Sequence, residues 1–127
     1  MTGYIINIEE KTLQNENFRE VLFTAQHSQL VVMSLLPGEE IGKEVHEIVD
    51  QFIRIEKGEG KAILNDEEFL LSDGSAVTVP AGVEHDIINT SSENKLKLYT
   101  VYSPAHHKDK TVHKTKQDAL ADTKDFI

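Results

Sequence analysis

The chain has 127 residues, no cysteine and a formal charge of −9, from 13 basic and 22 acidic residues. This length suits one domain with a substantial core. The missing cysteines exclude thiol catalysis and thiolate metal sites, so any metal must be bound by nitrogen and oxygen atoms. The acidic balance argues against binding to nucleic acid or to an anionic membrane surface. Because neither a signal-peptide pattern nor a bilayer-length apolar run is found, we predict a cytoplasmic protein.

The middle of the chain has the pattern of an all-β protein. Before it, residues 4–8 are compatible with an edge strand, and residues 9–17 with a connector or a single helical turn. From residue 18 to residue 102, short alternating or β-branched apolar runs are separated by glycine, proline, asparagine or aspartate, which is typical of a sandwich or barrel. The expected strands are 20–25, 30–36, 45–48, 52–57, 60–64, 67–71, 75–79, 86–89 and 96–102.

The composition changes after Pro104, and residues 104–127 are expected to form a C-terminal tail or helix. The basic residues of segment 106–116 are diluted by aspartates and carry no interleaved aromatic residues, which indicates a solvated tail rather than a nucleic-acid patch. A short surface helix should start near Thr115, with Asp118 in its first turn.

Four histidines lie outside any recognisable pattern. A lone histidine is more often a hydrogen-bonded core or surface residue than a ligand. We expect this for His27, His106, His107 and His113. For the His106-His107 pair we expect a flexible surface loop, and the alternative is a lid that folds back over the mouth of a barrel.

Glu44 and His46 form the first pair of candidate functional residues. Side chains two positions apart in a strand point to the same side, so both can reach a single point inside a barrel. Gln51 follows after a short connection, and the same alternation places Ile53 and Ile55 beneath it. Polar groups at the mouth above apolar residues are typical of a barrel pocket.

A second segment runs from residue 74 to residue 89. Pro80 and Gly82 predict a tight reversal, which delivers His85 at the start of the following strand as a further candidate ligand. The segment reads glycine, five residues, Pro-x-Gly, two residues, histidine, three residues and asparagine. It resembles the second motif of the cupin superfamily, which is matched at every position, by Gly74, Pro80, Gly82, His85 and Asn89.

The first motif of the same family is matched in part. Gly38, His46 and Gly58 stand at the family's spacing, whereas Glu44 replaces the first histidine and Gln51 replaces the glutamate. The resemblance covers about residues 30–103. It implies a double-stranded β-helix, the cupin jelly-roll barrel, with a short C-terminal helix, in a single domain over residues 1–127.

The resemblance also implies a metal site with a mixed set of nitrogen and oxygen ligands. One divalent ion, chosen among Mn, Fe, Co, Ni and Zn, suits such a set, with positions left for water or substrate. Small cupins named after phosphomannose isomerase are similar in their mixed ligands. The alternative is a metal-free pocket in which the acid and the amide only hydrogen-bond the histidines. The implied ligands are Glu44, His46, Gln51 and His85.

These features favour a metal-dependent isomerase or proton-transfer enzyme acting on a small carbonyl or sugar-like substrate. Glu44 is the candidate proton-transferring residue. Tyr102 and Tyr99 have opposite parity in the last expected strand, so at most one faces inward, where a hydroxyl could orient a substrate. Two alternatives stay open: an Fe(II)-dependent dioxygenase and a non-catalytic cupin that binds or senses a small molecule. A homodimer formed through barrel edges is also expected, with apolar residues near Phe52 and Phe69 available for contact.

Overall fold

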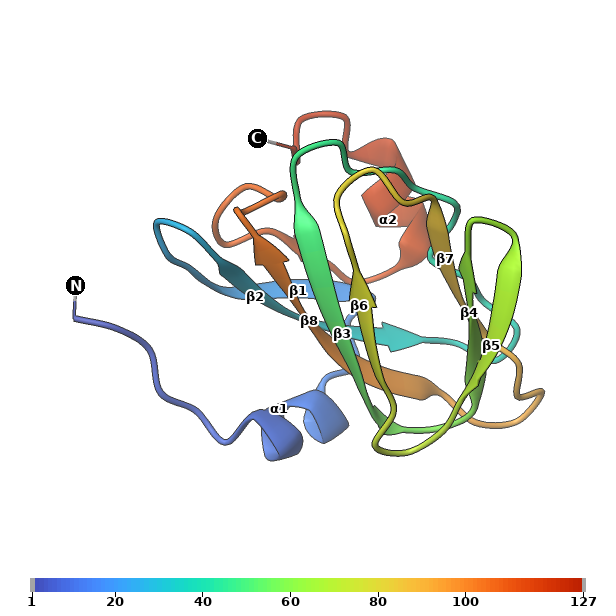
Figure 1. The fold of residues 1–127 in the computed structure, drawn as a ribbon. Helices are drawn as coiled ribbons and strands as arrows, with labels where there is room; N and C mark the ends of the chain where they lie inside the picture. Colours follow the sequence, from blue (N-terminus) through green and yellow to red (C-terminus); the bar gives the residue numbers. More distant parts are fainter. Residues whose placement is uncertain (1, 127) are drawn as a thin grey trace.

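The computed structural model describes residues 2–126, which form two antiparallel sheets (Figure 1). The larger sheet has the strand order β6-β3-β8-β2-β1-β9, and the smaller has the order β5-β4-β7. The elements are α1 (Ile8–Gln14), β1 (Arg19–Thr24), β2 (Gln29–Leu35), β3 (Asp50–Lys57), β4 (Gly60–Leu64), β5 (Glu67–Leu71), β6 (Ala76–Val79), β7 (His85–Asn89), β8 (Leu96–Ser103), β9 (Val112–His113) and α2 (Lys116–Ala121).

The core lies between the two sheets and follows the two-residue alternation of the strands. In β3, Gln51, Ile53 and Ile55 are buried between more exposed neighbours, as the alternation predicts. β8 lies beside β3 and β2 in the middle of the larger sheet, so its inward side chains are almost fully covered. The jelly-roll fold expected from the cupin motifs is therefore confirmed.

Two of the predicted strands are wrong. Residues 45–48 form no strand, and Val45 and Ile48 are exposed. Their β-branched side chains mimic a strand, but within and next to the segment only His46 and Val49 are buried, and no neighbouring strand pairs with it. Residues 4–8 do not join a sheet either; instead the chain enters α1, where the Asn7 side chain caps the backbone N–H of Glu10.

The C-terminal segment is not the solvated tail that its composition predicts. His107 is 1% exposed and His113 is 3% exposed. The two-residue strand β9 pairs with β1 at the edge of the larger sheet, which removes His113 from solvent. The expected short helix is present as α2, with Thr115 as its N-cap and the N–H of Asp118 bonded to the threonine hydroxyl. Among residues 2–126, no helix is long and apolar enough to cross a membrane.

Candidate metal centre

The backbone brings the two motif segments together at one end of the barrel. Glu44 and His85 exchange both backbone hydrogen bonds, each with an N···O distance of 2.9 Å. The turn before β7 is attached as well, because the N–H of Gly82 donates to the carbonyl of His46 at 2.8 Å. Residues directly paired in this way point their side chains to the same side of the sheet. The fold therefore directs Glu44, His46 and His85 toward the barrel mouth.

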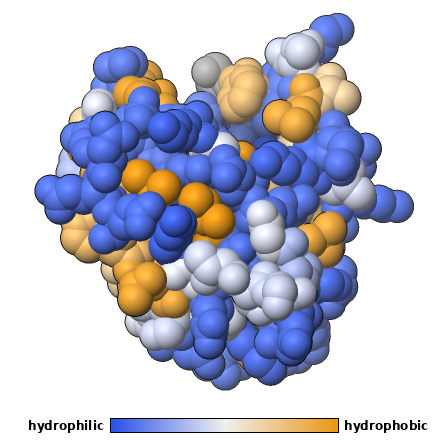
Figure 2. All heavy atoms as spheres, turned by 90° about the vertical axis from the view of Figure 1, so that its right-hand side faces the viewer, coloured by the Kyte–Doolittle hydropathy of each residue, from blue (hydrophilic) through white to orange (hydrophobic). Residues whose placement is uncertain are grey.

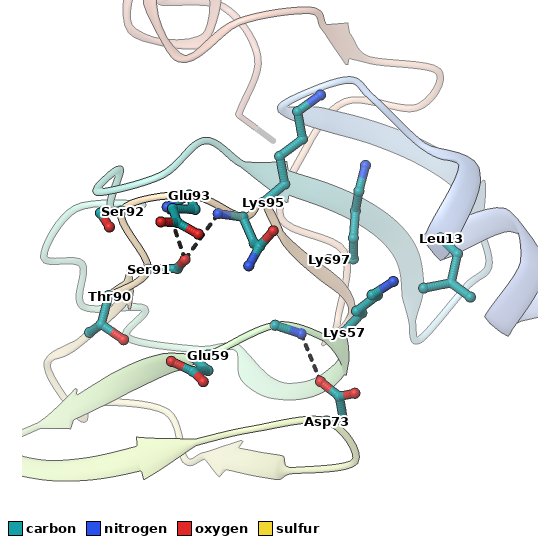
Figure 3. A pocket seen from close by; sticks show the side chains of 12 residues that line it. Leu13, Lys57, Glu59, Asp73, Thr90, Ser91, Ser92, Glu93, Lys95 and Lys97 are labelled. Carbon is teal, nitrogen blue, oxygen red and sulfur yellow. Dashed lines mark hydrogen bonds between the residues drawn. The ribbon is translucent and has the colours of Figure 1, made fainter.

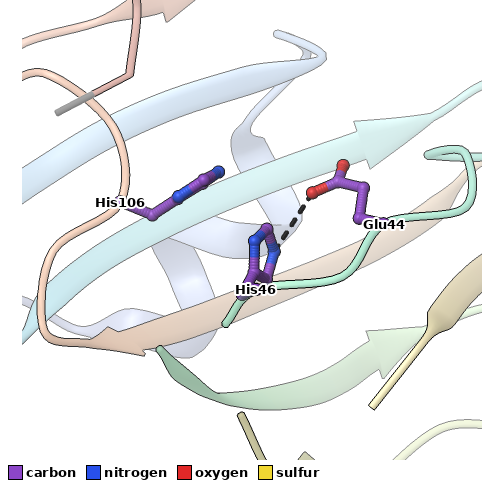
Figure 4. Close-up of side chains that lie close together, drawn as sticks. All are labelled: Glu44, His46 and His106. Carbon is purple, nitrogen blue, oxygen red and sulfur yellow. Dashed lines mark ion pairs between the residues drawn. The ribbon is translucent and has the colours of Figure 1, made fainter. Parts of the chain in front are cut away.

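Glu44 and His46 point toward each other in the arrangement expected of two ligands on one ion (Figure 4). Glu44 Oε2 lies 3.1 Å from His46 Nε2. The buried Nε2 atom nevertheless has no hydrogen-bond partner of acceptable geometry among residues 2–126. Adjacent ligands at about 2.1 Å from one metal ion are about 3 Å apart, so the pair fits a divalent metal.

His106 is the third member of this group, and it is not among the ligands expected from the sequence. Its ring centroid lies 4.2 Å from that of His46, and donor atoms of Glu44, His46 and His106 all lie within 4.8 Å of one another. The segment after Pro104 thus folds over the barrel mouth, as in the lid alternative, rather than forming a flexible loop (Figure 4). The only sequence signal was the histidine pair itself.

The other two predicted ligands, His85 and Gln51, face the interior but lie outside this trio. The carbonyl of Val83 accepts from His85 Nδ1 at 3.0 Å, which leaves Nε2 of His85 available for a ligand. The His85 ring lies 5.0 Å from that of His46. Gln51 donates from Nε2 to Thr100 Oγ1 at 3.0 Å, and its buried Oε1 has no partner among the described residues. Both side chains therefore keep one atom available to bind a metal ion, Nε2 of His85 and Oε1 of Gln51.

The charge states in this region also suit a metal. Burial would raise the pKa of the Glu44 carboxyl, but His46, Arg19 and His106 together hold that pKa below its ordinary value. Burial, with the neighbouring His46, lowers the pKa of His106 to about 4. The group is therefore an ionised carboxylate beside a neutral imidazole at neutral pH, and these are the forms that bind metal ions.

Tyr102 is the inward-facing tyrosine of β8, whereas Tyr99 is partly exposed on the opposite side. The Tyr102 ring lies 6.0 Å from the His46 ring, and its hydroxyl is 3.3 Å from Nε2 of His107. Burial raises the pKa of Tyr102, so the hydroxyl keeps its proton and acts as a hydrogen-bond donor.

A large hollow on the surface lies elsewhere. It has a volume of about 950 Å³ and is formed by turns at the opposite end of β3, beside α1 (Figure 3). Several of its polar groups already have partners: Asp73 accepts from the N–H of Gly58 at 2.8 Å, and Lys95 and Lys97 pair with Glu16, which lies outside the lining. This hollow is an open polar cleft and does not include the group at the barrel mouth.

The comparisons with known proteins identify the class to which this fold and site belong. Residues 31–102 match the family described as the cupin domain, so the chain belongs to the cupin family.

Relatives of the chain are found in bacteria and in a virus. It is 45% identical over 124 residues to protein YrkC of Bacillus subtilis, covering 93% of this chain and 66% of that protein. It is 48% identical over 107 residues to protein L612 of Acanthamoeba polyphaga mimivirus, covering 82% and 67%. The chain thus spans about two thirds of the length of these curated relatives. The crystal structure of BH2720 from Bacillus halodurans is 38% identical, with a TM-score of 0.91 over 94% of both chains.

Proposed function

We propose that this cupin binds one divalent metal ion at the barrel mouth, through Glu44 and His46, with His85 and Gln51 as further ligands. The observation that carries the proposal is the 3.1 Å approach of Glu44 Oε2 to His46 Nε2 without a hydrogen bond. A buried imidazole nitrogen that meets its neighbouring carboxylate outside hydrogen-bond geometry is costly unless a ligand occupies it. The mixed nitrogen and oxygen donors suit Mn, Fe, Co, Ni or Zn.

The proposed activity is metal-assisted proton transfer or isomerisation on a small carbonyl or sugar-like molecule. When bound, a divalent ion supplies Lewis-acid polarisation of a substrate oxygen. Glu44 is ionised and sits at the mouth, so it is the residue proposed to accept or return the proton. Tyr102 remains protonated and offers its hydroxyl for orienting a polar group of the substrate.

The first experiment is elemental analysis of gently purified protein, with His46→Ala and His85→Ala beside the wild type. His27→Ala is the matched control, because His27 is exposed and lies outside both motifs in the sequence. Near-stoichiometric metal in the wild type and the control, lost in both motif variants, would support the site. A wild type that cannot be loaded from excess Mn, Fe, Ni or Zn would refute it. Turnover in a sugar-phosphate screen must then exceed that of His85→Ala for the isomerase proposal to stand.

A specific observation favours one alternative reaction. The close trio contains two imidazoles and one carboxylate, which is the ligand composition of iron-dependent oxygenases that activate O₂. Oxygen consumption by the Fe(II)-loaded protein, and not by the Zn-loaded protein, would favour the dioxygenase. A saturable thermal shift with a small molecule that stays chemically unchanged would instead favour a binding or sensing module.

We also propose a homodimer formed through barrel edges, with exposed apolar residues of β5 and β3 in the contact. In β5, Phe69 is 45% exposed and Leu70 is 89% exposed, and Phe52 on β3 is 37% exposed. Figure 2 faces the side that carries β4, β5 and β7, where hydrophobic side chains gather among hydrophilic ones. Sedimentation velocity should give twice the chain mass for the wild type and the monomer mass for Leu70→Glu; a monomeric wild type would refute the dimer.

A further inference from the structure

We propose that His106, which lies outside both motifs, is an additional ligand of the same ion, and that Gln29, His107 and Asp125 are positioning residues that hold it at the barrel mouth. The inference rests on the proposed metal site and extends it. It means that the C-terminal segment, and not the barrel alone, completes the centre.

Gln29 fixes the backbone on which His106 is carried. This glutamine begins β2, points into the barrel and is 1% exposed. Its Oε1 accepts from the N–H groups of His106 at 3.2 Å and of His107 at 3.0 Å. Its Nε2 donates to the carbonyl of His107 at 2.7 Å. One buried amide thus holds two consecutive residues through three bonds.

Asp125 holds the same segment from the other side. Its Oδ2 accepts from His107 Nδ1 at 2.8 Å, and both side chains are at most 2% exposed. The backbone N–H of Lys108 also donates to the carbonyl of Asp125. Burial lowers the pKa of His107 to about 2, so its imidazole is neutral and the contact is a hydrogen bond. Burying a carboxylate is costly unless its partners are well placed, so this bond selects one position of the segment. Arg19, at 4.0 Å from the same oxygen, supplies the positive charge that faces this carboxylate.

With its backbone held on both sides, the His106 ring lies between two other rings. It is 4.2 Å from the His46 centroid and 4.9 Å from that of Phe126. The bond from His106 to Gln29 uses the backbone N–H, which leaves the imidazole nitrogens for other partners. The ring therefore offers a nitrogen ligand atom within 4.8 Å of those of Glu44 and His46.

The test uses Co²⁺ binding by the full chain, because its visible absorption reports the number and type of ligands. His106→Ala should weaken Co²⁺ binding at least tenfold and change the spectrum, since a water would replace an imidazole. Gln29→Ala and Asp125→Ala should weaken binding by about 10-fold to 100-fold, as is typical for residues that support metal ligands. Asp125→Asn keeps an acceptor oxygen and should restore most of the affinity. His27→Ala should match the wild type.

The outcomes separate this inference from the proposed function. If His46→Ala loses Co²⁺ but folded His106→Ala keeps the wild-type affinity and spectrum, then the inference is overturned and the proposed site stands. If Asp125→Asn binds no better than Asp125→Ala, the positioning role of the carboxylate is overturned. A wild type that binds no Co²⁺, Zn²⁺ or Ni²⁺ overturns both proposals.

Discussion

Replacing the motif asparagine, Asn89, with alanine should destabilise the fold without removing metal. Its side-chain nitrogen donates to the carbonyls of Leu35, Leu36 and Asn94 at 3.1, 3.1 and 2.9 Å. Its side-chain oxygen accepts from the N–H of Ser91 at 3.0 Å. Asn89 is 1% exposed, so it joins β7 to two loops through groups that water cannot replace.

The magnitude follows from the bonds that are lost. Two N–H groups and one carbonyl make three hydrogen bonds, each with a net value of about 1 kcal/mol, so the free energy of unfolding should fall by about 3 kcal/mol. For 127 residues, an unfolding entropy of about 2.1 cal/mol/K per residue converts this loss to a decrease in Tm of about 11 °C.

Urea unfolding and calorimetry of Asn89→Ala measure both quantities. Asn94→Ala is the matched control, because Asn94 is exposed and contributes only its backbone carbonyl to this network. The control should lose less than about 0.5 kcal/mol, and metal content should be unchanged in both variants. A loss below about 1 kcal/mol in Asn89→Ala, or a loss of metal with stability intact, would refute the reasoning.

Three further predictions concern packing, metal and pH. A Cβ on Gly60 would lie 2.6 Å from a carbonyl oxygen of β7, so Gly60→Ala should lower the free energy of unfolding in urea by about 1–3 kcal/mol. Gly74 has a φ of +88° but open space around it, so Gly74→Ala should lower it by about 1 kcal/mol. A larger loss in Gly74→Ala than in Gly60→Ala would contradict the packing argument. Chelation of metal from protein held at about 100 times its Kd should remove about 2.7 kcal/mol and lower the Tm by about 10 °C, whereas no shift would count against a folded-state site. Hydrogen bonds from Lys95 and Lys97 hold the pKa of Glu16 below 4.5, so the stability that they add is present above about pH 4.5 and is lost as the pH falls. In Glu16→Gln at low salt, the free energy of unfolding should therefore decrease less on acidification than in the wild type. An unchanged pH profile would exclude the effect.

Much of the barrel could be predicted from local pattern. Residues 60–64 and 67–71 were expected as strands and match β4 and β5. Asn65 and Asp66 between them have φ values of 46° and 69°, the conformation that these two residue types accept in a tight turn. Alternation and turn chemistry act over a few residues, so they can be recognised without knowing which strands pair.

The same local rule predicted half of the candidate site. Glu44 and His46 were expected to point to one place because they are two positions apart, and their side-chain atoms lie 3.1 Å apart. The segment that carries them is nevertheless no strand, because strand formation requires a partner and residues 45–48 have none. Here the direction of the side chains was predicted correctly although the secondary structure was not.

The sequence by itself determined the barrel, through alternation, turn residues and two motifs anchored by glycines, and it indicated Glu44, His46, Gln51 and His85 as the proposed ligands. Only the tertiary structure decided that His106 joins them. Its contact with Gln29 spans 77 positions, and the hydrogen bond that fixes the segment is made by Asp125, close to the C-terminus. Such contacts depend on where β2 and the C-terminal segment meet in space. Short-range periodicity cannot predict this contact, because a polar segment that stays on the surface and one that is buried by distant partners have the same composition.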